Sequence, residues 1–118
     1  MSTPPVSIHP YFKVHAGKME AALALLPQFI AKTATEAKVL YYDFTISGDV
    51  VACREAYADA EGMLGHVGNV GELLGAMLEI SELIRLEIHG PAAEIEKLKE
   101  PTAHLSPALF VAVCGLER

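Results

Sequence analysis

One stretch, Val50-Val51-Ala52-Cys53-Arg54-Glu55-Ala56-Tyr57, has the pattern of a β-strand that runs into the start of a helix. Glu55 and Tyr57 are two residues apart, so on a strand both side chains point to the same face of the sheet. Asp59 follows at the position of an N-cap, and His66 lies about two turns along the helix that Asp59 would start. The stretch therefore predicts a strand–helix junction that carries a carboxylate, a phenol and an imidazole.

The segments on either side alternate between strand and helix patterns. Alternating apolar residues predict strands over 7–16, 38–46, 50–58 and 81–89, and Ser47-Gly48-Asp49 predicts a tight hairpin between the middle two. Helical spacing predicts a helix over 18–36, kinked at Pro27, and a broken helix over 59–80 that turns at Gly68-Asn69. The resulting βαββαβ order predicts an α+β, ferredoxin-like antiparallel sheet with its helices on one face.

The side chains expected to face the core follow from the same periodicities. In the first helix they are Met19, Ala22, Leu23, Leu26, Ile30 and Thr33; in the second strand Leu40, Tyr42, Phe44 and Ile46; in the fourth strand Ile84, Leu86 and Ile88. For residues 50–57 both alternatives stay open, because each face of that strand mixes polar and apolar side chains.

Residues 91–118 extend the chain beyond this pattern. They contain a short charged helix over 92–100, which Pro101 is expected to end, and an apolar run over 109–113 that predicts a fifth strand. We expect residues 1–118 to form a single domain, because this length suits one core. An apolar edge strand invites pairing, so the extension is expected to contribute to a homodimer by pairing with the partner subunit.

The sheet face that points away from the helices is expected to be neither fully polar nor fully apolar. Its side chains include His9, Tyr11, Lys13, His15, Tyr41, Asp43, Leu83, Arg85, Glu87 and His89. A mixture of this kind suits a second sheet that packs across a cavity, which again favours a symmetric homodimer.

Composition excludes several classes of protein. Hydrophobic residues make up 52% and charged residues 20% of the chain, as in a globular domain. The net charge of −6 argues against nucleic-acid binding, which needs clustered Lys and Arg. No apolar run is long enough to span a membrane, and residues 1–5 lack the features of a signal peptide. Cys53 and Cys114 lie in apolar runs, so a reducing, cytoplasmic setting is expected.

Several short motifs resemble those of the antibiotic biosynthesis monooxygenase family. They are Val14-His15-Ala16-Gly17-Lys18 before the first long helix, Tyr42 in the second strand, and Arg54-Glu55-Ala56-Tyr57-x-Asp59 followed by His66. The last motif is also similar to the small isomerase that processes phosphorylated autoinducer-2. The resemblance covers roughly residues 7–89. It implies a dimeric α/β barrel made of two ferredoxin-like subunits, with a ligand cavity between sheet and helices. Many members of the family oxidise quinols or polyphenols without metal or flavin, a few degrade haem, and others isomerise or only bind.

The candidate catalytic residues are Glu55, Tyr57 and His66, acting as a base or hydrogen-bond pair with a proton shuttle. The candidate substrate-cavity residues are His9, Tyr11, Tyr41, Asp43 and Arg85. The alternative for the first group is structural: Glu55 pairs with Arg85, Tyr57 is an ordinary core residue, and His66 is hydrogen-bonded locally.

No metal site or other cofactor is expected, since the sequence lacks His-x-His, Cys-x-x-Cys and paired helical histidines. The function expected is that of a small cofactor-independent monooxygenase acting on an aromatic, quinol or hydroxyketone metabolite. The alternatives are a non-catalytic ligand-binding or stress-associated dimer, an isomerase of the autoinducer-processing type, and, motivated by the histidines, a haem-binding protein.

Overall fold

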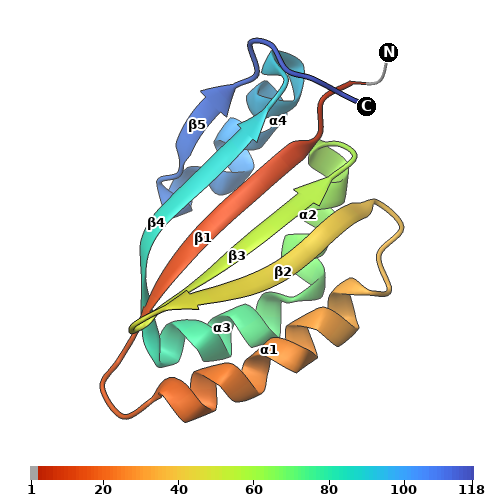
Figure 1. The fold of residues 1–118 in the computed structure, drawn as a ribbon. Coiled ribbons are helices and arrows are strands. Elements are labelled where there is room, and N and C mark those ends of the chain that lie inside the picture. Colours follow the sequence, from red (N-terminus) through yellow and green to blue (C-terminus); the bar gives the residue numbers. More distant parts are fainter. Residues whose placement is uncertain (1–2) are drawn as a thin grey trace.

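One five-stranded sheet carries all the helices on one of its faces (Figure 1). The computed structural model describes residues 3–118. The strands are β1 (Val6–Val14), β2 (Val39–Ser47), β3 (Val50–Tyr57), β4 (Ser81–Gly90) and β5 (Ala108–Val111). The helices are α1 (Met19–Thr33), α2 (Ala60–Asn69), α3 (Gly71–Glu79) and α4 (Ala92–Thr102), followed by the short 3-10 helix η1 (Ala103–Leu105).

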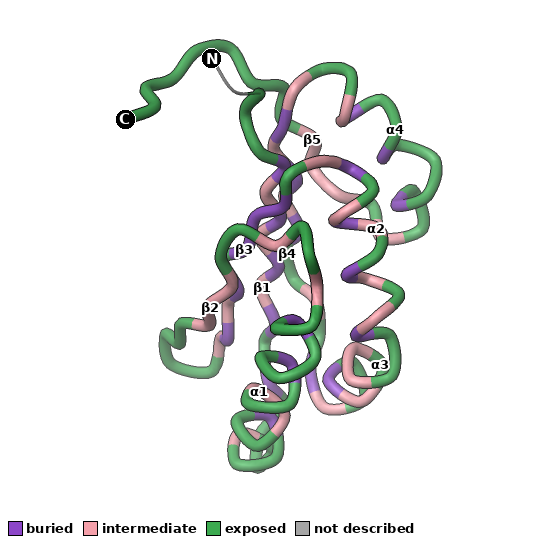
Figure 2. Tube along the Cα trace, turned by 90° about the vertical axis from the view of Figure 1, so that its right-hand side faces the viewer, coloured by how far each residue is buried: buried purple, intermediate pink, exposed green. Residues whose placement is uncertain are grey.

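The strand order β2-β3-β1-β4-β5 confirms the ferredoxin-like α+β fold. Strands β1 to β4 pair antiparallel, and β1 lies in the centre between β3 and β4. The β2–β3 hairpin turns at Gly48, whose positive φ of 58° costs a glycine nothing sterically. Figure 2 shows buried positions along the strands and exposed positions along the C-terminal tail.

The C-terminal strand pairs within its own chain and lies at the edge of the sheet, so its expected pairing with a partner subunit stays a prediction. Strand β5 lies parallel to β4, with Glu87 opposite Ala108 and Gly90 opposite Val111. Helix α4 makes the crossover that parallel strands require. It runs on to Thr102 with Pro101 inside it, because a proline in the last turn removes only one of the helix's hydrogen bonds.

The structure decides which face of β3 meets the helices. The side chains of Val51, Cys53, Glu55 and Tyr57 are buried there, and Arg54 points to the opposite face. The core lies in two neighbouring clusters, one under α2 and α4 and one under α1 and α3.

Three expected core patterns are wrong in detail. An irregularity in the β1–β4 register, between Tyr11 and Phe12, places Leu83 toward the core and leaves Ile84 48% exposed. In α1 the buried stripe runs through Ala22, Phe29 and Thr33, while Leu23 and Ile30 are exposed. In β2 only the middle of the expected face is covered: Tyr42 and Phe44 pack on the core, whereas Leu40 and Ile46 are exposed.

The start of α2 follows the predicted capping. Asp59 accepts a 2.8 Å hydrogen bond from the backbone N–H of Gly62 and forms an ion pair with Lys38. Helix α2 ends at Asn69 and α3 begins at Gly71, close to the predicted turn at Gly68-Asn69. His66 lies on the side of α2 that faces β3. Within residues 3–118 no helix is long and apolar enough to cross a membrane.

Candidate functional site

A cavity of about 100 Å³ lies between the sheet and the helices. Its walls are mostly aromatic and aliphatic, with Phe12, Phe29, Phe44, Met77, Leu83 and Leu86 among them. Residues of the C-terminal extension, Pro101, Thr102, His104 and Leu105, form part of the same wall. None of the described residues that line it is Lys or Arg. A site of this kind suits an uncharged, largely apolar molecule.

The titratable side chains that line the cavity are few and sit close together, apart from His104 of the extension. Glu55 and Cys53 come from β3, Tyr42 from the neighbouring β2, and His66 from α2. Tyr42 is the cross-strand neighbour of Glu55, and its ring centroid lies 5.0 Å from that of His66. The sheet register and the facing helix thus bring these groups to one part of the cavity wall.

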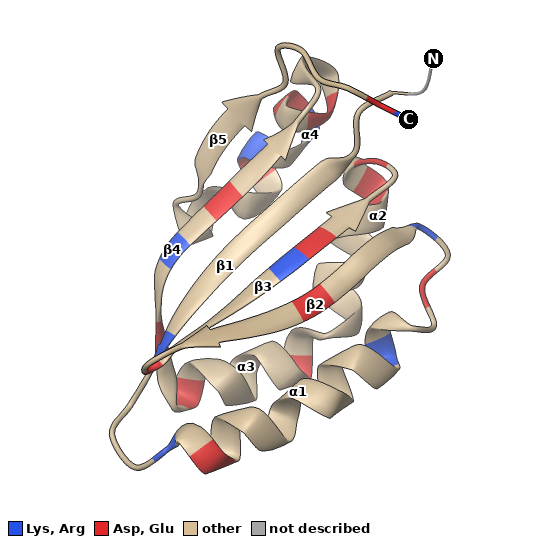
Figure 3. Ribbon diagram, viewed as in Figure 1, with Lys and Arg blue, Asp and Glu red and all other residues tan. Residues whose placement is uncertain are grey.

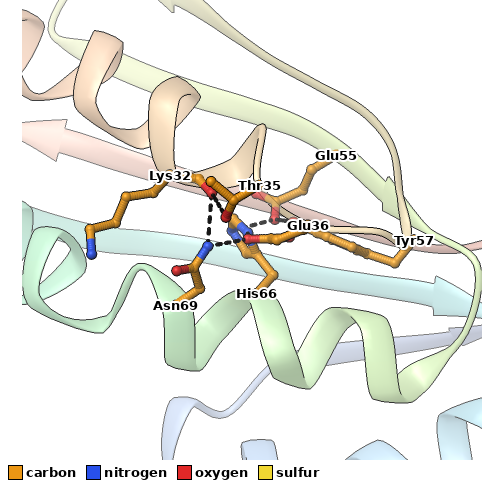
Figure 4. A network of polar contacts seen from close by, with 7 residues as sticks. All are labelled: Lys32, Thr35, Glu36, Glu55, Tyr57, His66 and Asn69. Atoms are coloured by element: carbon orange, nitrogen blue, oxygen red, sulfur yellow. Dashed lines mark hydrogen bonds and ion pairs between the residues drawn. The ribbon is translucent and has the colours of Figure 1, made fainter.

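Glu55 is the centre of the polar group. It is 4% exposed, and its Oε1 accepts a 2.7 Å hydrogen bond from the hydroxyl of Tyr57. The same Oε1 lies 3.3 Å from Nε2 of His66. Figure 4 shows the imidazole of His66 between Glu55 on one side and Glu36 on the other.

The far side of His66 is held by residues outside the predicted site. Its Nδ1 lies 2.9 Å from Oε2 of Glu36, in the segment between α1 and β2. Asn69 donates to the same Oε2 and to the backbone carbonyl of Lys32, each at 2.9 Å. Within residues 3–118, the buried Oε1 of Glu36 has no hydrogen-bond partner. This set (Glu36, Glu55, Tyr57, His66 and Asn69) is called the buried polar cluster below.

Burial shifts the proton equilibria of these groups. It raises the pKa of Glu55, and the nearby His66 and the Tyr57 hydroxyl oppose that shift. Burial is also the main cause that raises the pKa of Tyr42, Tyr57 and Cys53. Cys53 therefore stays a neutral thiol, which argues against a nucleophilic role. Among these groups, Glu55 is the one whose pKa moves toward neutral pH.

The structure brings together the three predicted catalytic residues, Glu55, Tyr57 and His66. Tyr57 is fully buried and is not among the described residues that line the cavity, so it contacts Glu55 from behind. Its ring packs 5.1 Å from that of His66.

The predicted substrate-cavity residues lie on the opposite face of the sheet. None of His9, Tyr11, Tyr41, Asp43 and Arg85 is among the described residues that line the cavity next to Glu55. Asp43 pairs with Arg54, and Arg85 pairs with Glu87 rather than with Glu55. His9 contacts His89, whose ring stacks on Phe110. The two predicted groups are thus separated by the thickness of the sheet.

Sequence patterns missed Glu36 and Asn69 of the buried polar cluster and did not assign Tyr42 to the site. Tyr42 lies on the strand face that the alternation predicted as core, so its position at the cavity was accessible from the pattern. Glu36 and Asn69 lie in a loop and at a helix end, where no periodicity marks a side chain as buried. Among residues 3–118, no group of three or more His, Cys, Asp or Glu side chains is arranged to hold a metal ion.

Comparisons with known protein structures agree on the fold. MupZ from Pseudomonas fluorescens is 36% identical, with a TM-score of 0.93 over 97% of this chain and 94% of MupZ. An antibiotic biosynthesis monooxygenase is 13% identical, with a TM-score of 0.65 over 70% of this chain and 94% of its own. Rv0793 from Mycobacterium tuberculosis is 23% identical, with a TM-score of 0.66 over 74% and 94%. No protein-family model and no curated protein sequence matches the chain.

Proposed function

Because this chain belongs to the family of MupZ from Pseudomonas fluorescens and has the fold of the antibiotic biosynthesis monooxygenases, we propose that it is a cofactor-independent enzyme in which Glu55 moves a proton to or from a small oxygenated metabolite. The observation that carries this proposal is the burial of Glu55 in an apolar cavity wall, between a phenol donor and an imidazole.

A buried carboxyl group of this kind suits general acid–base catalysis. Such catalysis is most efficient when the pKa of the group lies near the working pH, and burial moves the pKa of Glu55 in that direction. Tyr57 supports this role because its hydroxyl holds the carboxylate in one orientation. A residue that served packing alone would not need two polar partners inside an apolar wall.

The walls favour a neutral aromatic or aliphatic substrate with one oxygen function directed at Glu55. Phosphate and carboxylate groups are commonly bound by Arg or Lys, and no described residue of the wall is Arg or Lys. A quinol or a neutral hydroxyketone fits this requirement, whereas a phosphorylated hydroxyketone does not. The cavity of about 100 Å³ accommodates the reacting end of such a molecule, and the exposed lining residues Leu78, Pro101 and His104 mark where the rest would reach solvent.

The reaction proposed first is oxygenation of a quinol. Glu55 accepts the hydroxyl proton, and the electron-rich anion that results supplies the electrons that reduce dioxygen. One oxygen atom becomes bonded to a ring carbon, the other leaves as water, and the quinol is oxidised to a hydroxyquinone. The same base acting on a carbon next to a carbonyl would instead give an enediol and hence isomerisation. Both reactions begin with a proton transfer to Glu55, so they share the site and differ in whether dioxygen is consumed.

We also propose that the protein works as a homodimer. The outer sheet face carries exposed apolar side chains, among them Tyr41, Ile84 and Phe110, beside the pair formed by His9 and His89. A second copy packed on this face would remove those side chains from water. The predicted cavity residues of the outer face would then lie at the interface.

The experiment that tests the function compares Glu55→Gln with the wild type on a panel of quinols and neutral hydroxyketones. Oxygen uptake reports oxygenation, and loss of carbon-bound hydrogen signals in D₂O reports proton abstraction. We expect Glu55→Gln to reduce the active reaction by about a hundredfold or more. Glu72→Gln, which changes an exposed glutamate of α3, is the control. Wild-type protein that binds the ligands without uptake or exchange would favour the non-catalytic alternative.

A further inference from the structure

Glu36 has no part in the function proposed above, yet its carboxylate is fixed inside the protein. It lies in the segment between α1 and β2, and its side chain is only 13% exposed. Oε2 contacts both Nδ1 of His66 and the amide of Asn69, whereas the buried Oε1 has no partner among residues 3–118. A carboxylate that is held this way loses hydration without full compensation, which calls for a role other than packing.

The partners of His66 decide where its protons sit. An ionised carboxylate only accepts hydrogen bonds, and Oε2 of Glu36 already accepts one from the amide of Asn69. Nδ1 of His66 therefore carries a hydrogen and donates it to Glu36 across 2.9 Å. The other ring nitrogen, Nε2, is left to face Oε1 of Glu55 at 3.3 Å. The imidazole thus bridges two carboxyl groups, one at each nitrogen.

This arrangement has two forms that differ by the position of one proton. In the first, Glu55 is protonated and its O–H points at the lone pair of Nε2. In the second, the proton is on Nε2, and an imidazolium lies between the carboxylates of Glu55 and Glu36. The other titratable groups that line the cavity are Tyr42, Cys53 and His104, and Tyr57 packs against the ring of His66 from outside the cavity. None of them is a fixed cation, so the positive charge on His66 is balanced by the two glutamates alone.

We propose that His66 and Glu36 form a proton relay between Glu55 and the surface on the side away from the cavity, in which Glu36 both holds the imidazole in position and accepts its proton. The proposal rests on the function assigned to Glu55 above. One transfer balances as follows: the O–H bond of Glu55 breaks and an N–H bond forms at Nε2, while the N–H bond at Nδ1 breaks and an O–H bond forms on Glu36. His66 remains neutral at the end of the transfer, in its other tautomer, and the proton reaches solvent from Glu36.

A relay of this kind would give the proton of Glu55 a path to water that a filled cavity does not provide. Glu55 is 4% exposed, and a bound substrate would fill the apolar space in front of it. Its proton then has no aqueous route through the cavity. The partly exposed segment of Glu36 and Asn69 lies behind His66, as Figure 4 shows, and Figure 4 also shows the Lys32 side chain directed away from the cluster. The route is therefore short and carries no competing ammonium group.

The first test needs no substrate. In the wild type, ¹⁵N and proton NMR should find the His66 hydrogen on Nδ1, in a charge-assisted hydrogen bond that exchanges slowly with water. In Glu36→Gln that N–H should exchange at least about tenfold faster, and Glu72→Gln should leave it unchanged. An Nδ1–H that is absent in the wild type, or unaffected by Glu36→Gln, overturns the proposal.

The second test measures proton delivery itself. Glu36→Ala should lower kcat by at least about tenfold with little change in KM, and added formate should restore kcat in proportion to its concentration, because formate supplies the missing carboxylate. Glu36→Asp should retain more activity than Glu36→Ala. A kcat that stays at the wild-type value, or that formate does not raise, overturns the relay. If instead the NMR coupling is present but Glu55→Gln turns over normally, the function proposed for Glu55 is what fails.

Discussion

The hydroxyl of Tyr57 donates a 2.7 Å hydrogen bond to Oε1 of Glu55 from behind the cavity wall. Tyr57 is fully buried, and Glu55 separates it from the space where a substrate would bind. The phenol therefore acts on Glu55 and not on the substrate. Its own pKa is raised by burial, so at neutral pH it remains a donor.

Tyr57→Phe should weaken the enzyme without abolishing it. Loss of the donor leaves Glu55 with one fewer partner in a buried site, which costs about 1–3 kcal/mol of unfolding free energy. Urea denaturation and kcat together check this, with Tyr11→Phe on the outer face of the sheet as the matched control. Equal losses in the two variants would contradict the role given to Tyr57.

The buried carboxyl group should also leave a signature in the pH dependence of stability. Burial raises the pKa of Glu55 above its ordinary value of 4.5, so the folded state disfavours the charged form. The stability contributed by the neutral form is present below pH 4.5 and is lost as pH rises through the folded pKa. Glu55→Gln, which keeps the shape without the charge, should therefore match the wild type at pH 4 and gain on it as the pH rises above 4.5, until the pH passes the folded pKa of Glu55. Urea denaturation across this range measures the difference.

The contribution of Asp59 to stability should change with pH in the opposite direction to that of Glu55. Hydrogen bonds from Lys38 and from the Gly62 backbone lower its pKa, so its contribution to stability is present at neutral pH and is lost as pH falls. Asp59→Asn should lose most relative to the wild type at neutral pH and least in acid. A Glu55→Gln difference that followed the same course as Asp59→Asn would contradict the burial argument.

Alternating and helical patterns were enough to predict the βαββαβ order, because each element buries one face and shows it in its spacing. They could not choose between the faces of β3, where Arg54 and Glu55 are both charged neighbours in sequence but differ completely in burial. Nor could they detect the irregular β1–β4 register that turns Leu83 inward, since an irregularity changes pairing without changing composition.

For a related reason, the sequence predicted only part of the site. Glu55, Tyr57 and His66 lie close in sequence, and the strand–helix junction brings them together almost by geometry alone. Glu36 lies 30 residues before His66 in the sequence. The distance in space between their side chains depends on how α1 packs against α2. The same applies to the separation of Arg85 from Glu55, which depends on which face each strand presents.

The glycines of α2 give a test of packing that is independent of function. A Cβ on Gly62 would lie 2.8 Å from the Cβ of Lys38, whereas a Cβ on Gly65 would meet nothing within 4 Å. Gly65→Ala should therefore stabilise the protein by about 0.5–1 kcal/mol through helix propensity. Gly62→Ala should destabilise it, because the start of β2 must move. Thermal unfolding of the two variants measures both effects, and a gain in both would show that α2 is not packed tightly on Lys38.

The outer face of the sheet gives the last prediction. If a second copy covers this face, the wild type should sediment at twice its 12.7 kDa, and Tyr41→Asp should shift it toward the single-chain mass. The reason is that a dimer would have to bury the new carboxylate beside Asp43, with no added cation to pair with it. Leu23→Asp is the matched control, since Leu23 is an equally exposed apolar residue on α1, on the other side of the molecule. Sedimentation velocity of the three proteins at one concentration decides the matter: a wild type of 12.7 kDa, or a dimer that Leu23→Asp dissociates and Tyr41→Asp does not, would place the interface elsewhere.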